Sequence, residues 1–490
     1  MPEVRAGTRE ILGLAWPALI VLAATPLYLL WDTAVVGRLG AVDLAALAAG
    51  ATVLAQVTTQ LTFLSYGTTA RSARRFGAGD RTGAVYEGVQ ATWVALGVGV
   101  VLAVVVGVAA PWICRVLTGD AAVAVDATRW LRVVSVAVVP ALVTMAGNGW
   151  LRGTADTRRP LYFTLVGVVP MAVIVPVAVA RVGLVGSAYA TVTGETLTAL
   201  CFLGALVVNW QRYGDGRPVR PQWSVIGPQL VLGRDLIVRS LSFQVAFVSA
   251  AAVAGRIGPA ALAAHQGMLQ LWNFLSLVLD SVAVAAQALV GAALGSGSAR
   301  AARSVGATVL RFSTVAGVVL AALLAAGHTV VPALFTTDAD VLATMAVPWW
   351  LLVVLALVGG VVFALDGVLL GASDVAFLRN ATVVSVVVGF IPLVWLSLAF
   401  DWGLTGVWCG LLAFLCLRLA AVLVRYRSGR WARVGTGTGH PGTDPTTEPR
   451  RPRQDPPAGL HPQGERRWRR GRRHHAAHRC LPGPGRVRRP

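Results

Sequence analysis

The sequence is poor in charged residues and contains no lysine. Only 13% of its 490 residues are charged, and all 42 basic residues are arginine. Because soluble domains carry about 25% charged residues, this composition excludes an ordinary soluble globular fold. Hydrophobic residues make up 56% of the chain, and the uninterrupted apolar run 93–110 is long enough by itself to cross a bilayer. The composition therefore predicts an all-α membrane protein that crosses the bilayer many times.

Clustered metal ligands and catalytic groups are also missing from the sequence. The five cysteines are scattered, and Cys409 and Cys416, two turns apart on one predicted helix, lack the spacing of a metal site. The sequence has no His-Glu-x-x-His motif and no nucleophile beside a base. We therefore expect no bound metal, no organic cofactor and no enzymatic activity.

Twelve apolar stretches, separated by clusters of Arg, Gly and Asp, predict twelve transmembrane helices. The predicted spans are residues 11–36, 43–69, 84–110, 125–150, 160–181, 185–210, 233–255, 260–292, 304–328, 341–369, 376–400 and 404–425. Arginines follow the even-numbered spans two to eight, so the positive-inside rule places both termini in the cytoplasm. The first span exceeds a signal-peptide core and has no cleavage site, which predicts a retained helix in a bacterial-type plasma membrane.

The segment 427–490 differs from the rest of the chain. It holds 16 arginines against 4 acidic residues and is rich in Pro and Gly. Such a composition cannot bury a core and predicts disorder. The stretch 465–475 has the charge to bind anionic lipid or nucleic acid, but a solvated cytoplasmic tail explains it equally well. Because no predicted span depends on this segment, we expect truncation after residue 430 to be tolerated.

An internal repeat organises the chain, because a shift of 218 residues aligns motifs of its two halves. The aligned pairs are 35–40 with 253–258, Gly77 and Gly79 with Gly295 and Gly297, 151–156 with 369–374 and, two residues further on, 183–186 with 403–406. Six spans per repeat is an even number, so both halves enter the membrane in the same orientation. The repeat predicts two six-helix lobes, 1–210 and 233–426, related by pseudo-two-fold symmetry about the membrane normal. A polar linker, 211–232, joins them.

Three stretches resemble the multidrug and toxic compound extrusion (MATE) transporters, and most of all their DinF-like branch. They are WDTAVVGRLG at 31–40, LRGTADTRRP at 151–160 and the segment 256–297. The resemblance covers about residues 8–430 and implies a twelve-helix, two-lobe antiporter. Such a protein exports organic, often cationic, drug-like compounds in exchange for protons or sodium. We expect the substrate and the lipid bilayer as its partners, no nucleic acid, and a monomer.

Asp32 is the residue around which the predicted mechanism is organised. A charged side chain inside a membrane costs about 2.5–3.5 kcal/mol on insertion scales, so a retained acid usually has a function. The resemblance implies that Asp32 couples cation movement to transport, together with Tyr28, Asn148 and Thr193, or Thr191 as the alternative. Tyr28 and Asp32 are four residues apart and share a helix face. In the alternative interpretation, Asp32 only reaches the headgroups and the others form helix–helix hydrogen bonds.

The fifth helix departs from the family pattern. Relatives carry an Asn and, in some, an acid there, whereas this chain has Met171 and Val175. A sodium ion requires several oxygen ligands, whereas a single carboxylate can carry a proton, so the sequence favours proton coupling. Withdrawal from water disfavours the ionised form of a carboxylate. Asp32 would then take up a proton outside and release it inside, and each protonation state would favour one conformation.

The second half offers candidate residues for a substrate cavity: Asp280, Asp366, Arg239, His265 and Met171. The acids, facing Asp32 across the pathway, predict a bulky organic cation or amphipathic substrate. The alternatives are an ion pair or hydrogen bond within the second lobe, and a packed histidine. Glu195 on the sixth span is ambiguous in the same way.

Two other functions stay open from the sequence. A lipid-linked-precursor flippase of the same superfold would need an arginine-lined cavity, and Arg239 is the basic residue that the sequence places in the interior. A non-transporting relative is the other alternative, because Met171 and Val175 remove polar groups from the predicted coupling site.

Overall fold

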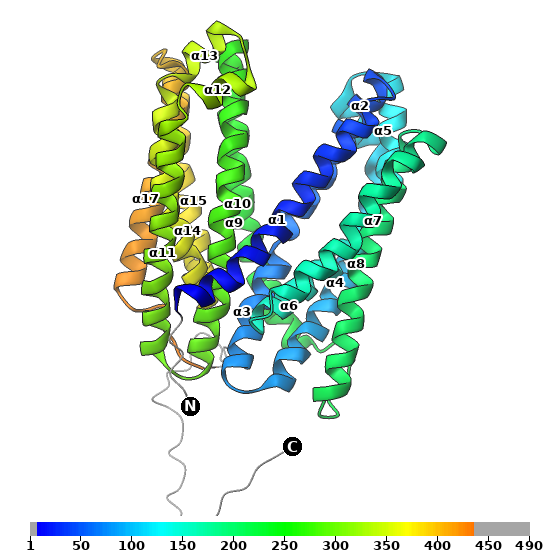
Figure 1. Ribbon diagram of the computed structural model, residues 1–490, viewed down its shortest axis with the longest axis vertical. Helices are drawn as coiled ribbons and strands as arrows, with labels where there is room; N and C mark the ends of the chain where they lie inside the picture. The colour runs from blue at the N-terminus through cyan, green and yellow to red at the C-terminus, as the bar shows by residue number, and fades with distance from the viewer. Residues whose placement is uncertain (1–6, 436–490) are drawn as a thin grey trace, which may run out of the picture. The chain divides into compact units, whose positions relative to one another are not determined.

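The computed structural model describes residues 7–435, and every regular element among them is a helix (Figure 1). The predicted tail beyond residue 435, including Cys480, lies outside the described residues. The first half comprises α1 (Thr8–Val36), α2 (Ala41–Leu61), α3 (Phe63–Gly77), α4 (Arg81–Thr118), α5 (Ala121–Val134), η1 (Ser135–Ala137), α6 (Val138–Gly153), α7 (Arg158–Val182) and α8 (Val185–Tyr213). The second half comprises α9 (Trp223–Ile257), α10 (Pro259–Gly295), α11 (Ala299–Ala326), α12 (Val330–Phe335), α13 (Ala339–Met345), α14 (Pro348–Gly371), α15 (Val375–Val384), η2 (Ser385–Phe390), α16 (Ile391–Ala399) and α17 (Gly403–Arg427).

Within residues 7–435, twelve helical stretches are long and apolar enough to cross a membrane, as predicted. Three of them consist of helices in line: α2 with α3, α5 with α6 through the 3₁₀ turn η1, and α15 with α16 through the π-helical stretch η2. The tenth predicted span starts too early, because α13 is a separate short helix and α14 begins at Pro348, a residue favoured in a first helical turn. The predicted linker 211–232 is too long, since α9 already begins at Trp223.

The internal repeat is visible in the backbone. Gly79 and Gly297 have φ angles of +80° and +83°, and Ala155 and Ser373 have φ angles of +59° and +58°. Non-glycine residues rarely adopt this left-handed conformation. Each pair is separated by the 218 residues of the predicted repeat, so the two halves make the same turns at the same places.

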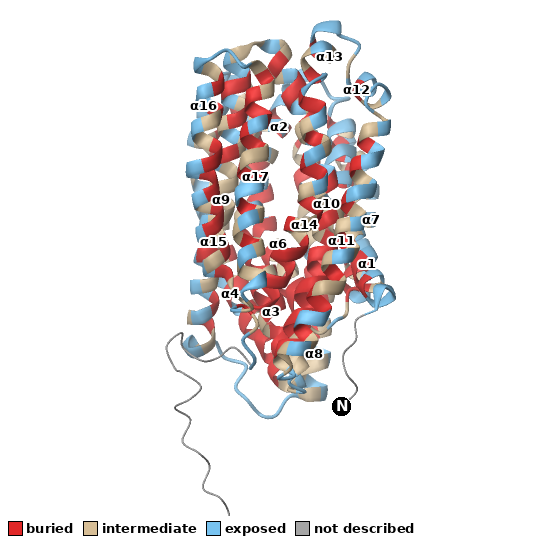
Figure 2. Ribbon diagram, turned by 90° about the vertical axis from the view of Figure 1, so that its left-hand side faces the viewer, coloured by how far each residue is buried: buried red, intermediate tan, exposed pale blue. Residues whose placement is uncertain are grey.

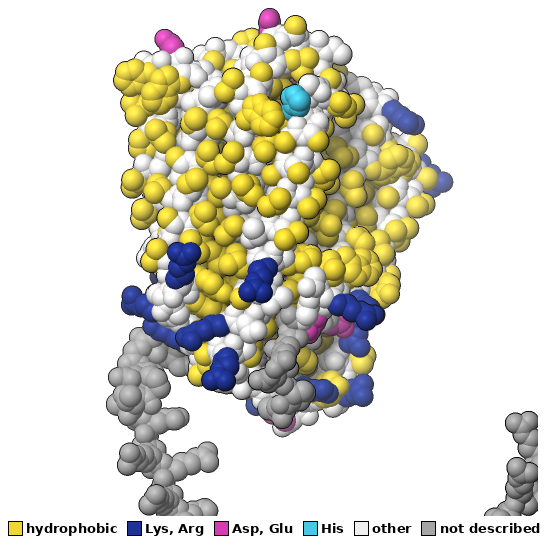
Figure 3. All heavy atoms as spheres, turned by 60° about the vertical axis from the view of Figure 1, so that its left-hand side comes forward, with side chains coloured by type: hydrophobic (Ala, Val, Ile, Leu, Met, Phe, Trp, Pro, Cys, Tyr) yellow, Lys and Arg dark blue, Asp and Glu magenta, His cyan; other side chains and the backbone are white. Residues whose placement is uncertain are grey.

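The connections α3–α4, α8–α9 and α10–α11 lie together at one end of the helices, which we call the arginine-rich end. Thr82 at the start of α4 donates a hydrogen bond to the carbonyl of Tyr213 at the end of α8 (2.6 Å). The ends of α3 and α10 contact each other through Gly77 and Ala292. On the face seen in Figure 3, arginine side chains gather at this end, below a broad band of hydrophobic side chains.

The two halves share one hydrophobic core toward the arginine-rich end and have separate cores toward the other. The shared core includes Leu64 and Ala146 of the first half and Val290 and Leu365 of the second. A second core contains only residues of the second half, and a third, around Tyr28 and Val36, contains only residues of the first. Figure 2 shows dense burial where α3, α6, α10 and α14 meet, and in Figure 1 the two halves diverge toward the far end.

Close backbone packing and hydrogen bonds hold the arginine-rich end together. A Cβ atom at Gly77 or Gly295 would clash with the backbone of the other half's helix. Gln287 Nε2 donates to the carbonyl of Tyr66 (2.6 Å), and the buried Arg74 donates through Nη2 to the carbonyl of Ala372 (2.6 Å). This end is therefore closed, because α3 and α10 approach without intervening side chains.

The residues after α17 take part in this closure. Trp431 is buried and stacks on Tyr426, with ring centroids 5.5 Å apart. Arg74 of the first half donates to the carbonyl of Gly435 (3.1 Å), whose own N–H donates to the carbonyl of Leu294 of the second half (3.2 Å). The expectation that residues 427–490 are disordered is thus wrong for Arg427, the last residue of α17, and for residues 428–435, which bridge both halves.

This bridge changes the expected effect of truncation. Removing residues 431–490 is expected to lower the midpoint of thermal unfolding by several degrees, because it deletes a buried tryptophan, whose truncation typically costs about 3–5 kcal/mol, and the contacts of Arg74. Removing only residues 436–490 leaves these contacts and is expected to leave the midpoint unchanged. Size-exclusion chromatography after heating of the detergent-solubilised variants measures both. Equal midpoints for the two truncations would show that the bridge contributes nothing.

Candidate functional site

Asp32 is buried near the far end of α1, with 2% of its surface exposed. Its Oδ2 accepts a hydrogen bond of 2.7 Å from the hydroxyl of Ser187, in the first turn of α8. Its Oδ1 is buried and has no hydrogen-bond partner. None of the ion pairs formed by the described residues includes Asp32, so this carboxyl group depends on a single neutral donor.

Tyr28 lies one turn before Asp32 and is also buried. Its hydroxyl is 3.3 Å from the hydroxyl of Thr191 on α8, so the alternative residue of the sequence prediction is the one in contact. Thr193 does not join the cluster, because it is exposed and its hydroxyl donates to the carbonyl of Tyr189 on its own helix. Two residues along a helix correspond to a rotation of about 200°, so Thr191 and Thr193 cannot both face α1.

Asn148 is buried on α6, and its side-chain oxygen has no partner. No side-chain hydrogen bond within residues 7–435 connects it to Asp32 or Tyr28. It belongs to the last turns of α6, where Gly149 packs on Ser65 of α3. The structure therefore separates Asn148 from the cluster in which the sequence placed it.

The fifth-span residues form an apolar wall rather than a cavity lining. Met171 and Val175 on α7 are buried in the same core as Tyr28, and Met171 contacts Gly194 of α8. The indole of Trp31 donates to the carbonyl of Ala172 (2.9 Å), which joins α1 to α7 at this level. Met171 is therefore a core residue in this conformation, and its proposed place in a substrate cavity is not supported.

The second half contains a cluster of three charged side chains, of which Asp366 and Arg418 are buried and Arg239 is partly buried. Asp366 on α14 accepts hydrogen bonds through Oδ2 from Arg239 on α9 (2.8 Å) and from Arg418 on α17. Both guanidinium groups also lie over the ring of Phe243, at 5.4 Å and 4.7 Å. The sequence identified Arg239 and Asp366 but not Arg418. An arginine deep within the last predicted apolar span is the pattern from which Arg418 could have been predicted as an interior residue.

Asp280 on α10 accepts a hydrogen bond of 2.8 Å from the hydroxyl of Tyr66 on α3 and so connects the two halves. Arg152 on α6, which is buried, and Arg239 are close enough to interact with its charge. Asp280 and Asp366 are therefore largely compensated by neighbouring donors and cations. In this conformation these two acids therefore supply little free negative charge for a cationic substrate.

His265 is fully buried on α10, and neither ring nitrogen has a hydrogen-bond partner. It packs edge-on against Trp408 with ring centroids 5.9 Å apart. Its placement in a substrate cavity is not supported, and the expected hydrogen bond of a packed histidine is absent within residues 7–435. No group of three or more His, Cys, Asp or Glu side chains among these residues could hold a metal ion.

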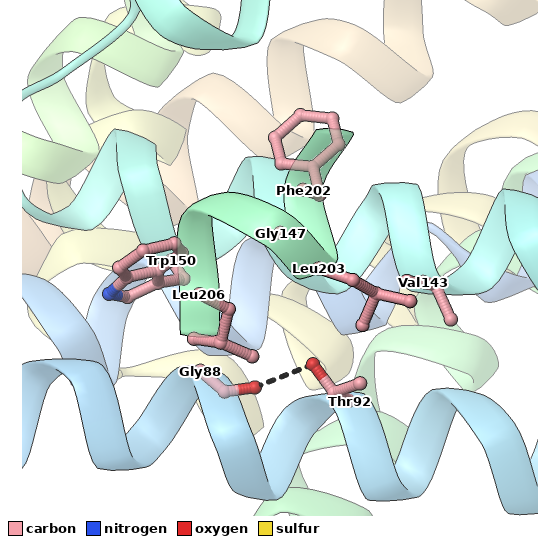
Figure 4. A pocket seen from close by; sticks show the side chains of 8 residues that line it. All are labelled: Gly88, Thr92, Val143, Gly147, Trp150, Phe202, Leu203 and Leu206. Atoms are coloured by element: carbon pink, nitrogen blue, oxygen red, sulfur yellow. Dashed lines mark hydrogen bonds between the residues drawn. The ribbon is translucent and has the colours of Figure 1, made fainter. Parts of the chain in front are cut away.

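Two crevices between helices are mainly apolar. In Figure 4, Trp150, Phe202, Leu203 and Leu206 line a seam between α4, α6 and α8, where the Thr92 hydroxyl donates to the carbonyl of Gly88 (2.9 Å); the seam leaves no room for a water-sized group. The second crevice lies in the second half, beside Trp272 and Trp408, and holds about 20 Å³. Neither is large enough for an organic substrate, so the Asp32 cluster remains the candidate site.

Comparisons with known proteins agree with this architecture. A family model described as MatE matches residues 17–177 and 236–396, and the two matches begin 219 residues apart, as expected for the internal repeat. Protein DETOXIFICATION 44, chloroplastic, from Arabidopsis thaliana is 32% identical over 449 residues, covering 88% of this chain and 82% of the relative. DNA damage-inducible protein F from Escherichia coli (strain K12) is 29% identical, covering 88% and 95%.

The fold is also similar to solved structures. One, described as the outward-facing conformation of a multidrug resistance MATE family transporter of the MOP superfamily, has a TM-score of 0.77 and 22% sequence identity, covering 86% of this chain and 94% of that chain. At this identity the likeness concerns the fold alone.

Proposed function

This chain belongs to the MatE family, and from that membership we propose that it is a secondary antiporter that exports organic compounds in exchange for protons. It is a multi-pass membrane protein of a family of efflux transporters. We propose further that it acts as a monomer in a bacterial-type plasma membrane, with both termini in the cytoplasm. The arginine-rich end would then be the cytoplasmic end.

The environment of Asp32 carries the proposal. A carboxyl group that is buried in an apolar core, outside any ion pair and with one unpartnered oxygen, can exist neutral or ionised. The two protonation states differ by a full charge in a medium of low polarity, so each favours a different packing of the first half. A proton thereby acts on the same equilibrium as the substrate, which is the requirement for exchange.

The small number of polar side chains around Asp32 favours proton coupling over sodium coupling. Ser187 is the single hydrogen-bond partner of its carboxylate among the described residues, and α7 contributes Met171 and Val175 instead of polar groups. A sodium ion would need more oxygen ligands than this site offers.

The closed arginine-rich end, with separate cores at the far end, supports a conformation that opens away from the cytoplasm.

The proposed substrate is a bulky organic cation or amphipathic compound. With Asp280 and Asp366 compensated, this preference now rests on Asp32 and on the apolar walls of the two halves, which discriminate weakly between shapes. The flippase alternative gains two buried arginines, Arg152 and Arg418, that the sequence had not placed in the interior. However, Arg239 and Arg418 both bind Asp366, which offsets one of their two positive charges, and Asp280 lies close enough to Arg239 to offset part of the other.

Inside-out vesicles containing the full-length protein test the proposal. Uptake of organic cations, neutral amphipathic compounds and multiply charged anions is measured with a proton gradient, with a sodium gradient and with neither. We expect uptake of cations and amphipathic compounds that requires the proton gradient and stops when a protonophore is added. Uptake of multiply charged anions alone, or dependence on sodium alone, would contradict the proposal.

A further inference from the structure

Three buried side chains from three helices form a continuous hydrogen-bonded chain that ends at Asp32. The indole N–H of Trp130 on α5 donates to the hydroxyl oxygen of Ser187 on α8 (3.3 Å), and the Ser187 hydroxyl donates to Oδ2 of Asp32 (2.7 Å). The exposed fractions of Trp130, Ser187 and Asp32 are 2%, 0% and 2%. Water therefore does not compete for these bonds in this conformation.

The direction of each bond is determined by the chemistry of the groups. An indole N–H can only donate, so Ser187 must accept from Trp130 and can direct its own hydrogen toward Asp32. Trp130 is held firmly, because its ring packs on Gly50 of α2 in the first-half core. Trp130 thus orients the serine hydroxyl as a donor, which is the orientation that favours an ionised carboxylate.

The second oxygen of Asp32 completes the arrangement. Oδ1 is buried without a partner, so a proton can add there while Oδ2 keeps its bond to Ser187. The titratable groups nearby are Tyr28 on α1 and Glu195 on α8. Facing this region, α7 contributes the apolar side chains Met171 and Val175. Among the described residues, no ion pair joins Asp32 to the other charged or titratable groups on the neighbouring helices, which are Asp43 on α2, Arg132 on α5, Arg181 on α7 and His265 on α10.

We propose that Ser187, aligned by Trp130, is the positioning residue that sets how tightly Asp32 holds its proton. The proton adds to Oδ1 and yields a neutral carboxyl group, and its loss restores the carboxylate that Ser187 stabilises through Oδ2. The serine thereby replaces the polar groups that Met171 and Val175 do not supply. The proposal rests on the proposed function, in which Asp32 carries the coupling proton.

Ser187→Ala tests this role in the full-length protein. It removes the one donor to the ionised form, so the midpoint of the pH profile of export is expected to move up by about one pH unit, a tenfold change in proton affinity. Ser187→Thr keeps the hydroxyl and is expected to retain the wild-type midpoint. Trp130→Phe removes the indole donor that aligns Ser187, along with part of the buried ring, and is expected to give a smaller shift in the same direction. Thr193→Ala, which removes an exposed hydroxyl from the same helix, is the matched control.

A second measurement separates this proposal from the proposed function. Infrared titration of the protein in lipid nanodiscs follows the carbonyl band of a protonated carboxyl group, assigned to Asp32 by its absence in Asp32→Asn. The band midpoint is expected to move with Ser187→Ala whether or not the protein transports. Unchanged band and export midpoints in Ser187→Ala would overturn the role of Ser187. A wild-type protein that titrates but does not export with a proton gradient would instead contradict the proposed function.

Discussion

Asp32→Asn is expected to abolish export driven by a proton gradient while leaving the protein folded in the membrane. Asparagine keeps the size of the side chain and can still accept the hydrogen bond of Ser187 through its amide oxygen. It cannot change charge, so the first half loses the group whose two states favour different conformations. The expected result is a fall in gradient-driven export by two orders of magnitude or to background.

The measurement compares uptake into inside-out vesicles at equal protein abundance and over a range of pH. Tyr28→Phe serves as a control in the same cluster, because it removes one hydrogen bond of 3.3 Å to Thr191 without removing a charge, and a modest loss of activity is expected. If Asp32→Asn exports at the wild-type rate and with the wild-type pH dependence, the coupling residue is not Asp32, and Asp280 becomes the first candidate.

Asp366→Asn is expected to destabilise the second half more than any other single removal of a charge. The substitution leaves the buried Arg418 and the partly buried Arg239 side by side with no carboxylate between them. Removing one partner from a buried ion cluster typically costs about 3–5 kcal/mol, because the remaining charge stays desolvated and unpaired. Low abundance in the membrane and a strongly reduced midpoint of thermal unfolding are the expected results.

Two further variants show whether the loss is electrostatic. Asp374→Asn breaks the pair of Asp374 with Arg425, which is partly exposed at the arginine-rich end, and should cost much less. Arg418→Met added to Asp366→Asn removes one of the uncompensated charges and should recover part of the lost stability. If the double variant is as unstable as Asp366→Asn alone, repulsion between the two arginines is not the cause.

Asp366 shows how much of a site could be predicted from the sequence. It identified an intramembrane acid and offered two roles, a substrate contact or an ion pair within the lobe. The structure supports the ion pair, because Asp366 is buried between two guanidinium groups. Asn148, the equivalent position in the first half, has no such cations bound, so the repeat did not predict the cluster.

The sequence by itself determined the number of spans, the internal repeat, the family and the presence of an acid, Asp32, within the first span. These properties are encoded locally, since a span is recognised from the length of its apolar run and a repeat from matching turns such as Gly79 and Gly297. An acid in an apolar helix is likewise visible without knowledge of its neighbours.

Only the tertiary structure decided which side chains meet. Ser187 rather than Thr193 faces Asp32, and Arg418 joins Arg239, because the rotation and register of one helix against another select the contacts. In a soluble protein, the polar face of a helix would reveal that rotation. Here lipid and protein interior are both apolar, so helices such as α1, α14 and α17 are hydrophobic all round, and their sequences do not distinguish the inner face from the outer one.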